Sequence, residues 1–477
     1  MKKWNLRSAV EEVKTYWDKP PEGKYIPYQE FVAYSVGGIG VNTINSLFGY
    51  VALTANCLLL GSAYQIAPMD LAIMSIVMSI LNLVKTPFIS MLVDNTNTKY
   101  GKFRPYLLIT GVPTAALLIL MAFIPNSLSY PLKCTMLSLI YALLMIFQSL
   151  YALAFTSLAQ VLTPNGEERT GLLSVSQFIY SLGPSIVNLF FPILAGLFAG
   201  GMTGFTAYRT LFPIFSVFGI ILSLWTFKGT EEKIVVPRNY VAKVRFVDGI
   251  SEIKSNKYFW LMTLYNVLGG LKGGIGGILA WYCIYVVRSD AVLGVMNAVI
   301  GTASVPGMLL APLLAKKIGK RSSLIWFNLL RAGFAGLMLV TTKSPFLFLA
   351  CLYLSTAAIG GDGVMVSAMT ADVFDYQQWK TGKRLEGFIT QFSGMLVTAA
   401  TMLFNLILPW FYEHYGLEKD YTVLFQEAVR TPIFNIMIIT TVISCLAAVI
   451  QILFYDMTEK KQAEIIADLK ERAEAEI

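Results

Sequence analysis

Long apolar blocks alternate with short polar segments along most of this chain. Each block is about 18 to 30 residues long, and a helix of about 20 apolar residues crosses the hydrocarbon core of a bilayer. The blocks do not alternate residue by residue, which distinguishes them from the strands of a membrane barrel. The pattern predicts twelve membrane-spanning helices, at about residues 31–60, 69–93, 106–124, 134–162, 172–199, 210–227, 258–287, 292–315, 323–341, 345–370, 387–411 and 432–455.

The longest internal polar segment divides the predicted helices six and six. The loops after the second and eighth helices both contain a Gly–Lys pair, at Gly101–Lys102 and Gly319–Lys320. This repeat indicates a duplicated six-helix unit, and transporters with two such halves bind their solute between them. We therefore expect an all-α membrane protein with two pseudo-symmetric halves. The predicted parts are an N-terminal cytoplasmic segment and six-helix bundle at 1–227, a cytoplasmic linker at 228–257, a second bundle at 258–455 and a cytoplasmic tail at 456–477.

The basic residues lie mainly on one predicted side of the membrane. Of the 37 Lys and Arg residues, 28 fall in the termini and in the loops that share their side. The other loops hold six, and Lys85, Lys272 and Arg331 lie inside predicted spans. Because cytoplasmic segments carry the excess of Lys and Arg, we expect a protein in the lipid of the cytoplasmic membrane with both termini in the cytoplasm. The net charge of +8 is therefore a topology signal, and no nucleic-acid partner is expected.

Other classes of function find little support in the composition. The five cysteines lie in or beside apolar blocks and form no CxxC pair, which argues against disulfides and a zinc site. A membrane-embedded enzyme would need a catalytic constellation, and the single histidine, His414, lies in a predicted external loop. No nucleotide-binding motif supports an ATP-driven pump. We expect no catalytic residue, no metal site and no cofactor.

Two loop motifs and a glycine-rich run carry a family resemblance. The motifs are KYGKFRP, at 99–105, and ADVFDYQQWKTGKRLEG, at 371–387, and the run is VGGIG, at 36–40. Together they resemble the glycoside–pentoside–hexuronide:cation symporter family, which is melibiose permease-like and has the major facilitator fold. The resemblance implies transport of a sugar-like solute driven by Na⁺, H⁺ or Li⁺. It also suggests that charged residues of the two loops form gating ion pairs: Asp94, Lys102, Arg104, Asp372, Asp375, Lys380 and Arg384.

The sequence departs from this family at the expected cation site. Members that couple to Na⁺ carry two acids four residues apart before a proline, and Asn82 and Thr86 stand there before Pro87. Lys85 lies between them, on the same side of a helix by its spacing. Neutral oxygens beside an ammonium suit Na⁺ poorly, so we predict that the Na⁺ site is absent.

Further charged positions of the family's site are also neutral in this chain. Asn42 replaces an acid of the first span, Ala152 and Thr156 replace an acid and a tryptophan of the fourth, and Thr398 replaces a lysine of the eleventh. We expect the solute to contact a set of polar residues in the cavity: Lys85, Lys272, Asn42, Asn82, Thr86, Thr156 and Thr398.

Lys85 and Lys272 place two positive charges at membrane depth. Such charges are costly and are usually paired or functional. Asp362 is the only carboxylate well inside a predicted span, so the cavity is net positive and suits an anionic solute. Two structural alternatives stay open: Lys272 and Asp362 can neutralise each other, and Lys85 can stand in for the missing cation. A proton taken up by Asp362 can also be coupled to transport.

These features predict a secondary active transporter that moves a glycoside-like or small organic-anion solute by alternating access, without the family's Na⁺ site. The alternatives are a uniporter or anion exchanger for a carboxylated solute, and a receptor of the same fold that no longer transports.

Overall fold

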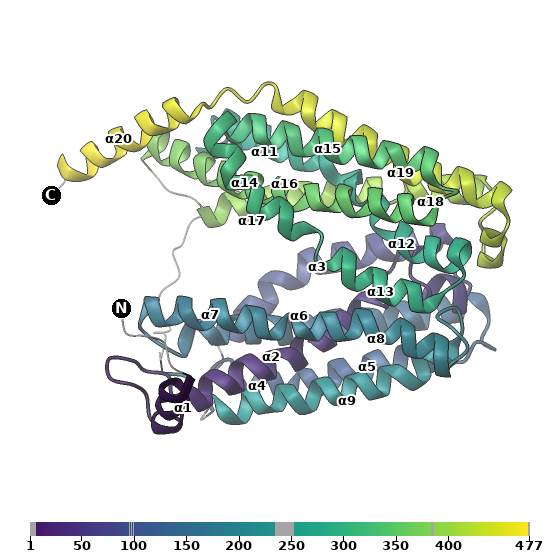
Figure 1. Ribbon diagram of the computed structural model, residues 1–477, viewed down its shortest axis with the longest axis horizontal. Coiled ribbons are helices and arrows are strands. Elements are labelled where there is room, and N and C mark those ends of the chain that lie inside the picture. The colour runs from purple at the N-terminus through teal and green to yellow at the C-terminus, as the bar shows by residue number, and fades with distance from the viewer. Residues whose placement is uncertain are drawn as a thin grey trace. The chain divides into compact units, whose positions relative to one another are not determined.

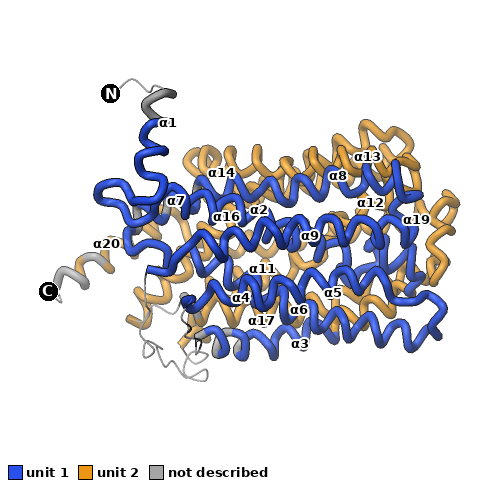
Figure 2. The backbone as a smooth tube through the Cα atoms, turned by 90° about the horizontal axis from the view of Figure 1, so that it is seen from below, with its two compact units in different colours: residues 1–66, 77–240 blue, residues 67–76, 241–477 orange. Residues whose placement is uncertain are grey.

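The computed structural model describes residues 6–94, 96, 98, 100–233, 252–382 and 386–475, and the chain divides into two compact units (Figure 2). Unit 1 contains residues 1–66 and 77–240, and unit 2 contains residues 67–76 and 241–477. The first turns of α3 (Pro68–Asp94) therefore group with unit 2, and its remainder groups with unit 1. Most of the predicted linker, at 234–251, lies outside the described residues.

Unit 1 is a bundle of helices (Figure 1). Besides most of α3, it contains α1 (Leu6–Thr15), α2 (Tyr28–Gly49), a short π-helix (Leu59–Ala63), α4 (Arg104–Ile109), α5 (Gly111–Phe123), α6 (Tyr130–Val161), α7 (Gly166–Tyr180), α8 (Leu182–Phe198) and α9 (Phe205–Gly229). Helix α2 packs against α5 to α9. The contact with α9 is close, since a Cβ added at Gly40 would lie 2.2 Å from the carbonyl oxygen of Gly219. Small residues allow such approach of two helices in a membrane.

Unit 2 repeats the bundle with a broken first span. It contains α11 (Lys257–Leu268), a 3₁₀-helix (Gly269–Gly277), α12 (Ile278–Trp281), a π-helix (Tyr282–Val287), α13 (Asp290–Gly301), α14 (Ser304–Ile318), α15 (Lys320–Thr341), α16 (Pro345–Thr381), α17 (Glu386–Phe404), α18 (Ile407–His414), a 3₁₀-helix (Tyr421–Phe425), α19 (Glu427–Ile452) and α20 (Glu459–Ala475). A 3₁₀ stretch longer than a few residues is uncommon and often marks a functional hinge. Here it coincides with the glycine-rich sequence GGLKGGIGG.

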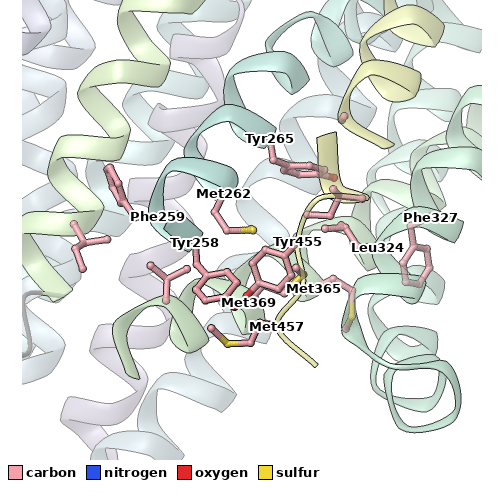
Figure 3. Packing of buried hydrophobic residues seen from close by; sticks show 14 of the residues in the cluster. Tyr258, Phe259, Met262, Tyr265, Leu324, Phe327, Met365, Met369, Tyr455 and Met457 are labelled. Carbon is pink, nitrogen blue, oxygen red and sulfur yellow. The ribbon is translucent and has the colours of Figure 1, made fainter. Parts of the chain in front are cut away.

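The core of unit 2 is rich in tyrosine and methionine (Figure 3). Tyr258 of α11 and Tyr455, which follows α19, pack edge to face with ring centroids 5.2 Å apart. Met365 and Met369 of α16 lie in the same cluster with Met457. These contacts hold the segment after the last long helix against the bundle.

Eleven helical stretches of the described residues are long and apolar enough to cross a membrane. The first predicted span is the one outside this group. Its helix, α2, ends at Gly49 and not near residue 60, and it carries Glu30, Asn42 and Asn45, which lower its hydropathy. Apart from this first span, the order of helices along the chain agrees with the predicted all-α membrane fold of two six-helix halves.

Candidate solute-binding and gating sites

Lys85 is buried two-thirds of the way along α3, with 6% of its surface exposed. Its ammonium donates hydrogen bonds to the backbone carbonyl of Met145, at 2.7 Å, and to the hydroxyl of Ser149, both on α6. Among the described residues no carboxylate pairs with it. Since an ammonium has three donors, one N–H is left for a ligand.

An open cleft of about 670 Å³ lies beside Lys85 in unit 1. Its other lining residues are almost all apolar: Leu81, Val84, Phe88, Ile89, Leu92, Thr96, Ile146 and Leu150. The cleft therefore combines a single positive charge with apolar walls, which suits an anionic group attached to a less polar body.

Of the three predicted cation-site positions on α3, Lys85 is buried and the other two are exposed. Asn82 and Thr86 are exposed, and the Thr86 hydroxyl donates to the Asn82 carbonyl at 2.7 Å. Lys85 turns instead towards α6. Helical spacing predicts how Asn82, Lys85 and Thr86 are arranged around the axis of α3. It does not predict that α6 covers the side of α3 on which Lys85 lies.

The other neutral members of the predicted site bond mainly within their own helices. Asn42 donates to the Gly38 carbonyl at 3.0 Å, Thr156 to the Ala152 carbonyl at 3.0 Å, and Thr398 to the Gly394 carbonyl at 2.8 Å. Thr156 is exposed, and Asn42 and Thr398 are half-buried. Asn42 and Thr156 belong to unit 1 and Thr398 to unit 2, so their meeting around one solute stays a prediction.

Lys272 of unit 2 forms an ion pair with Asp362. Its ammonium, on the 3₁₀ stretch, lies 3.6 Å from a carboxylate oxygen of Asp362 on α16. The Tyr265 hydroxyl joins the two groups, since it accepts from Lys272 at 2.9 Å and donates to Asp362. Asn328 donates to Asp362 and to the Tyr265 hydroxyl, each at 2.7 Å. The sequence suggested the pair but gave no sign of Tyr265 or Asn328.

Arg331 completes the same buried cluster. Its guanidinium donates to the backbone carbonyl of Lys272 at 2.6 Å, and 6% of the residue is exposed. The bond satisfies a carbonyl of the 3₁₀ stretch, where the normal helical pairing is lost. Lys272, Arg331 and Asp362 together carry one net positive charge.

Two of the predicted gating residues of unit 1, Lys102 and Arg104, lie where α4 begins. Gly101 has a φ of +105°, which favours glycine, and the backbone amides of Lys102, Phe103 and Arg104 all donate to Glu232, at 2.8, 2.7 and 2.9 Å. The Arg104 guanidinium donates to the Phe227 carbonyl at 2.7 Å. Glu232, which follows α9, thus caps the first turn of α4, where the N–H groups lack partners.

Unit 2 has the equivalent arrangement at α15. Gly319 has a φ of +82°, and the Lys320 amide donates to Glu459 at 2.6 Å. The Lys320 ammonium binds Asp372 at 2.7 Å, and Gln462 donates to the same carboxylate. Lys380 donates to the Ser255 carbonyl at 2.6 Å.

Side-chain partners cannot be assigned for three of the predicted gating residues, Asp94, Asp375 and Arg384. Asp375 is half-buried at the end of α16, only the backbone of Asp94 is described, and Arg384 lies outside the described residues. The partners found for the other gating residues lie within their own units. Ion pairs between the two loops therefore stay a prediction.

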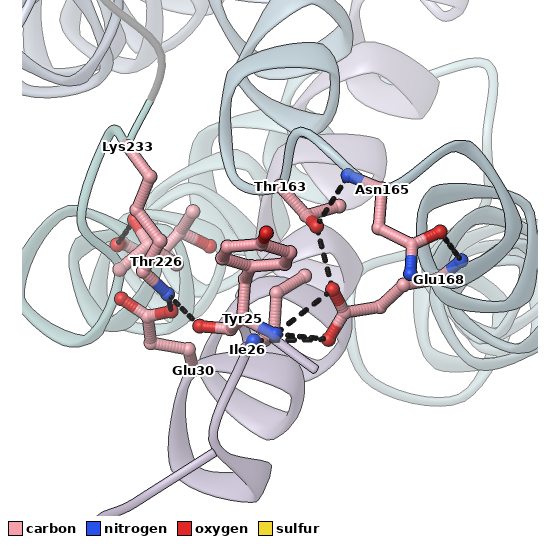
Figure 4. Close-up of polar contacts among 9 residues, drawn as sticks. Tyr25, Ile26, Glu30, Thr163, Asn165, Glu168, Thr226 and Lys233 are labelled. Atoms are coloured by element: carbon pink, nitrogen blue, oxygen red, sulfur yellow. Dashed lines mark hydrogen bonds and ion pairs between the residues drawn. The ribbon is translucent and has the colours of Figure 1, made fainter. Parts of the chain in front are cut away.

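The chain segment after α9 is also tied to the start of α2 (Figure 4). The Lys233 ammonium binds the Glu30 carboxylate and the Tyr25 carbonyl, the latter at 2.6 Å. Glu168 accepts from the backbone amides of Tyr25, at 3.1 Å, and Ile26, at 2.9 Å. These contacts join positions more than 100 residues apart, which no local pattern could reveal.

The family model described as MFS/sugar transport protein matches residues 33–459. The chain belongs to this family. The resemblance to a sugar symporter family of the major facilitator fold is thereby confirmed, and so are the predicted fold class and the assignment as a membrane transporter that is not an enzyme.

Curated relatives of this MFS/sugar transport protein agree with that assignment. The chain is 24% identical to the uncharacterized symporter YnaJ of Bacillus subtilis, over 94% of this chain and 96% of that protein. It is 24% identical to the isoprimeverose transporter of Lactiplantibacillus pentosus, over 77% and 76%. It is 25% identical to a glucuronide carrier protein homolog of Escherichia coli, over 81% and 84%. The protein is therefore a secondary active transporter of a small solute.

Proposed function

We propose that this transporter carries a sugar-like solute with an anionic group, and that Lys85 is the counter-ion of that group. The main support is the buried Lys85 ammonium, which has two neutral hydrogen-bond partners and lies beside an open cleft. A carboxylate or sulfonate would neutralise a charge that is costly at membrane depth. The name of the glucuronide carrier homolog supports the same class, since a glucuronide bears a carboxylate.

The remaining predicted contacts complete this proposal. Asn42, Asn82, Thr86, Thr156 and Thr398 supply neutral hydrogen-bond groups for the sugar, and Lys272 supplies a second positive charge. The charged loop residues gate the cavity, and the protein lies in the cytoplasmic membrane with both termini in the cytoplasm. The basic residues of one set of loops support this orientation.

We propose H⁺ and not Na⁺ as the coupling ion, with Asp362 as the group that takes it up. Asn82 and Thr86 offer neutral oxygens where a Na⁺ site needs charged ones. Asp362 is held by Lys272, so an anionic solute that attracts Lys272 would free the carboxylate for a proton. Exchange of one anion for another, with no proton, is the alternative, because the net positive charge of the cluster could be balanced by the solute alone.

The test is solute binding to the purified transporter. Methyl glycosides and the matched methyl glycuronides would be titrated against the wild type, Lys85→Ala and Lys133→Ala. Lys133 is a second buried lysine of unit 1, whose ammonium donates to the Tyr64 carbonyl at 3.0 Å and to Asn126 at 2.8 Å. It therefore controls for general loss of a buried charge.

We expect Lys85→Ala to weaken binding of the glycuronides about 10- to 100-fold, which is the range for a hydrogen bond to a charged group. Binding of neutral glycosides should change little, and Lys133→Ala should leave the preference intact. Equal binding of neutral and carboxylated sugars, unaltered in Lys85→Ala, would contradict the anionic class and leave Lys85 as a resident replacement for the cation.

A further inference from the structure

Two side-chain amides join α2 to α6 in unit 1. Gln148 donates from Nε2 to Oδ1 of Asn45 at 3.2 Å. Both residues are half-buried, and this is the only hydrogen bond of either side chain among the described residues. Polar side chains inside spans are costly to bury, and they either bond across helices or belong to a functional site.

The pair presents a free acceptor next to a free donor. Gln148 keeps its carbonyl oxygen and Asn45 keeps its N–H groups, and neither is among the sealed polar atoms that lack partners. If the O and N atoms of both amides are interchanged, Asn45 becomes the donor and Gln148 the acceptor. A free donor then still lies beside a free acceptor. Each amide also fixes the orientation of the other, so the two free groups are held ready for a ligand.

The amide pair and the Lys85 contact lie at the same level of α6. Gln148 directly precedes Ser149, whose hydroxyl receives a hydrogen bond from the Lys85 ammonium. The two contacts are therefore about 1.5 Å apart along the axis of α6 and about 100° apart around it, so α2 and α3 meet neighbouring sides of α6 at the same depth. A solute with an anionic group at Lys85 would carry its neighbouring atoms towards this part of α6.

We propose that Asn45 and Gln148 form a specificity-determining pair that binds two neighbouring hydroxyl groups of the transported sugar. A hydroxyl both donates and accepts, so one hydroxyl can donate to the free amide oxygen while the next accepts from the free N–H. This inference rests on the proposed function, in which Lys85 holds the anionic group of the same solute. The pair would distinguish sugars by their ring hydroxyls, and Lys85 would distinguish them by charge.

The experiment compares intact sugars with analogues that lack one hydroxyl. Methyl glucosides, galactosides and xylosides, and the uronides of the first two, would be titrated against the purified wild type, and the tightest binder would then be compared with its monodeoxy analogues. Gln148→Leu and Asn45→Leu remove the pair from either side. Gln451→Leu is the matched control, since Gln451 is a buried amide of α19 that donates to the Leu261 carbonyl at 2.6 Å.

We expect the wild type to bind one or two of the monodeoxy analogues about tenfold more weakly than the parent sugar, as for the loss of one hydrogen bond. Gln148→Leu and Asn45→Leu should bind the parent about tenfold more weakly and should no longer distinguish it from those analogues. Gln451→Leu should keep the wild-type ratio. A purely structural pair would weaken parent and analogues equally and keep the ratio, and that result would overturn the inference.

The outcome also separates this inference from the proposed function. If Lys85→Ala abolishes the preference for uronides while the amide variants keep the hydroxyl ratio, only the amide pair is refuted. If the amide variants lose the hydroxyl ratio on neutral glycosides while Lys85→Ala changes nothing, only the anionic class is refuted. A wild type that binds none of these sugars overturns both.

Discussion

Each unit of this transporter buries a lysine inside a span, and the two lysines have different partners. Lys272 meets the Asp362 carboxylate and a tyrosine hydroxyl, and Asn328 donates to both of these groups, so the carboxylate balances the lysine charge within unit 2. Lys85 meets a backbone carbonyl and a serine hydroxyl, so its charge is solvated but not neutralised. The same residue type at membrane depth is therefore paired with a carboxylate in one half and has no counter-charge among the described residues in the other.

The largest expected effect on stability comes from breaking the Lys272–Asp362 ion pair. Asp362→Ala leaves Lys272 without its counter-charge, and breaking a buried pair from one side costs about 3–5 kcal/mol. We expect a large fall in the thermal unfolding temperature of the purified protein. The double variant with Lys272→Met should recover most of the loss. A single variant as stable as the wild type would mean that the pair is not coupled in the folded protein.

Replacing each lysine by methionine sharpens the contrast. Lys272→Met leaves the Asp362 charge buried and should destabilise the protein by about 3 kcal/mol. Lys85→Met should change the unfolding free energy by less than about 1 kcal/mol, because the Ser149 hydroxyl still donates to the Met145 carbonyl at 2.7 Å. Chemical denaturation of both variants measures the difference. Equal losses would show that Lys85 is also a structural residue.

The two capping glutamates offer a smaller comparison. Glu232 accepts three backbone amides of the α4 start, whereas Glu459 accepts the Lys320 amide of the α15 start. We expect Glu232→Ala to cost about 2 kcal/mol and Glu459→Ala about 1 kcal/mol, within the range for helix caps. Glu231→Ala, at an exposed neighbouring position, is the control. Thermal unfolding in the same detergent would rank the three, and the reverse order would contradict the capping role.

The smallest expected effect is that of sodium. Titration of the solute with Na⁺ or with choline as the cation should give the same affinity, since Asn82 and Thr86 supply no charged oxygen for Na⁺. The solute affinity of Asn82→Ala should likewise be the same with Na⁺ and with choline. Uptake into proteoliposomes that requires a Na⁺ gradient, and loses it in Asn82→Ala, would show that these neutral oxygens hold the ion.

The helices and their division into two halves could be predicted from hydropathy, because a bilayer requires long continuous apolar segments. The partnership of Lys272 and Asp362 could also be anticipated, since few charges lie inside spans. The orientation of Lys85 could not, because a helical period relates residues of one helix and does not say which side a neighbour covers. Glu232 and Glu459 were missed for a similar reason: their partners lie more than 100 residues away.

The 3₁₀ stretch of unit 2 is longer than an α-helix of the same number of residues. Nine residues, Gly269–Gly277, adopt this form, and they rise about 18 Å, where an α-helix of nine residues rises about 13.5 Å. The first span of unit 2 is therefore about 4.5 Å longer than the same number of residues would be as α-helix. A conversion of the stretch to α-helix would shorten the span by nearly one turn and draw Trp281 towards Leu268, with no change in the number of residues between them.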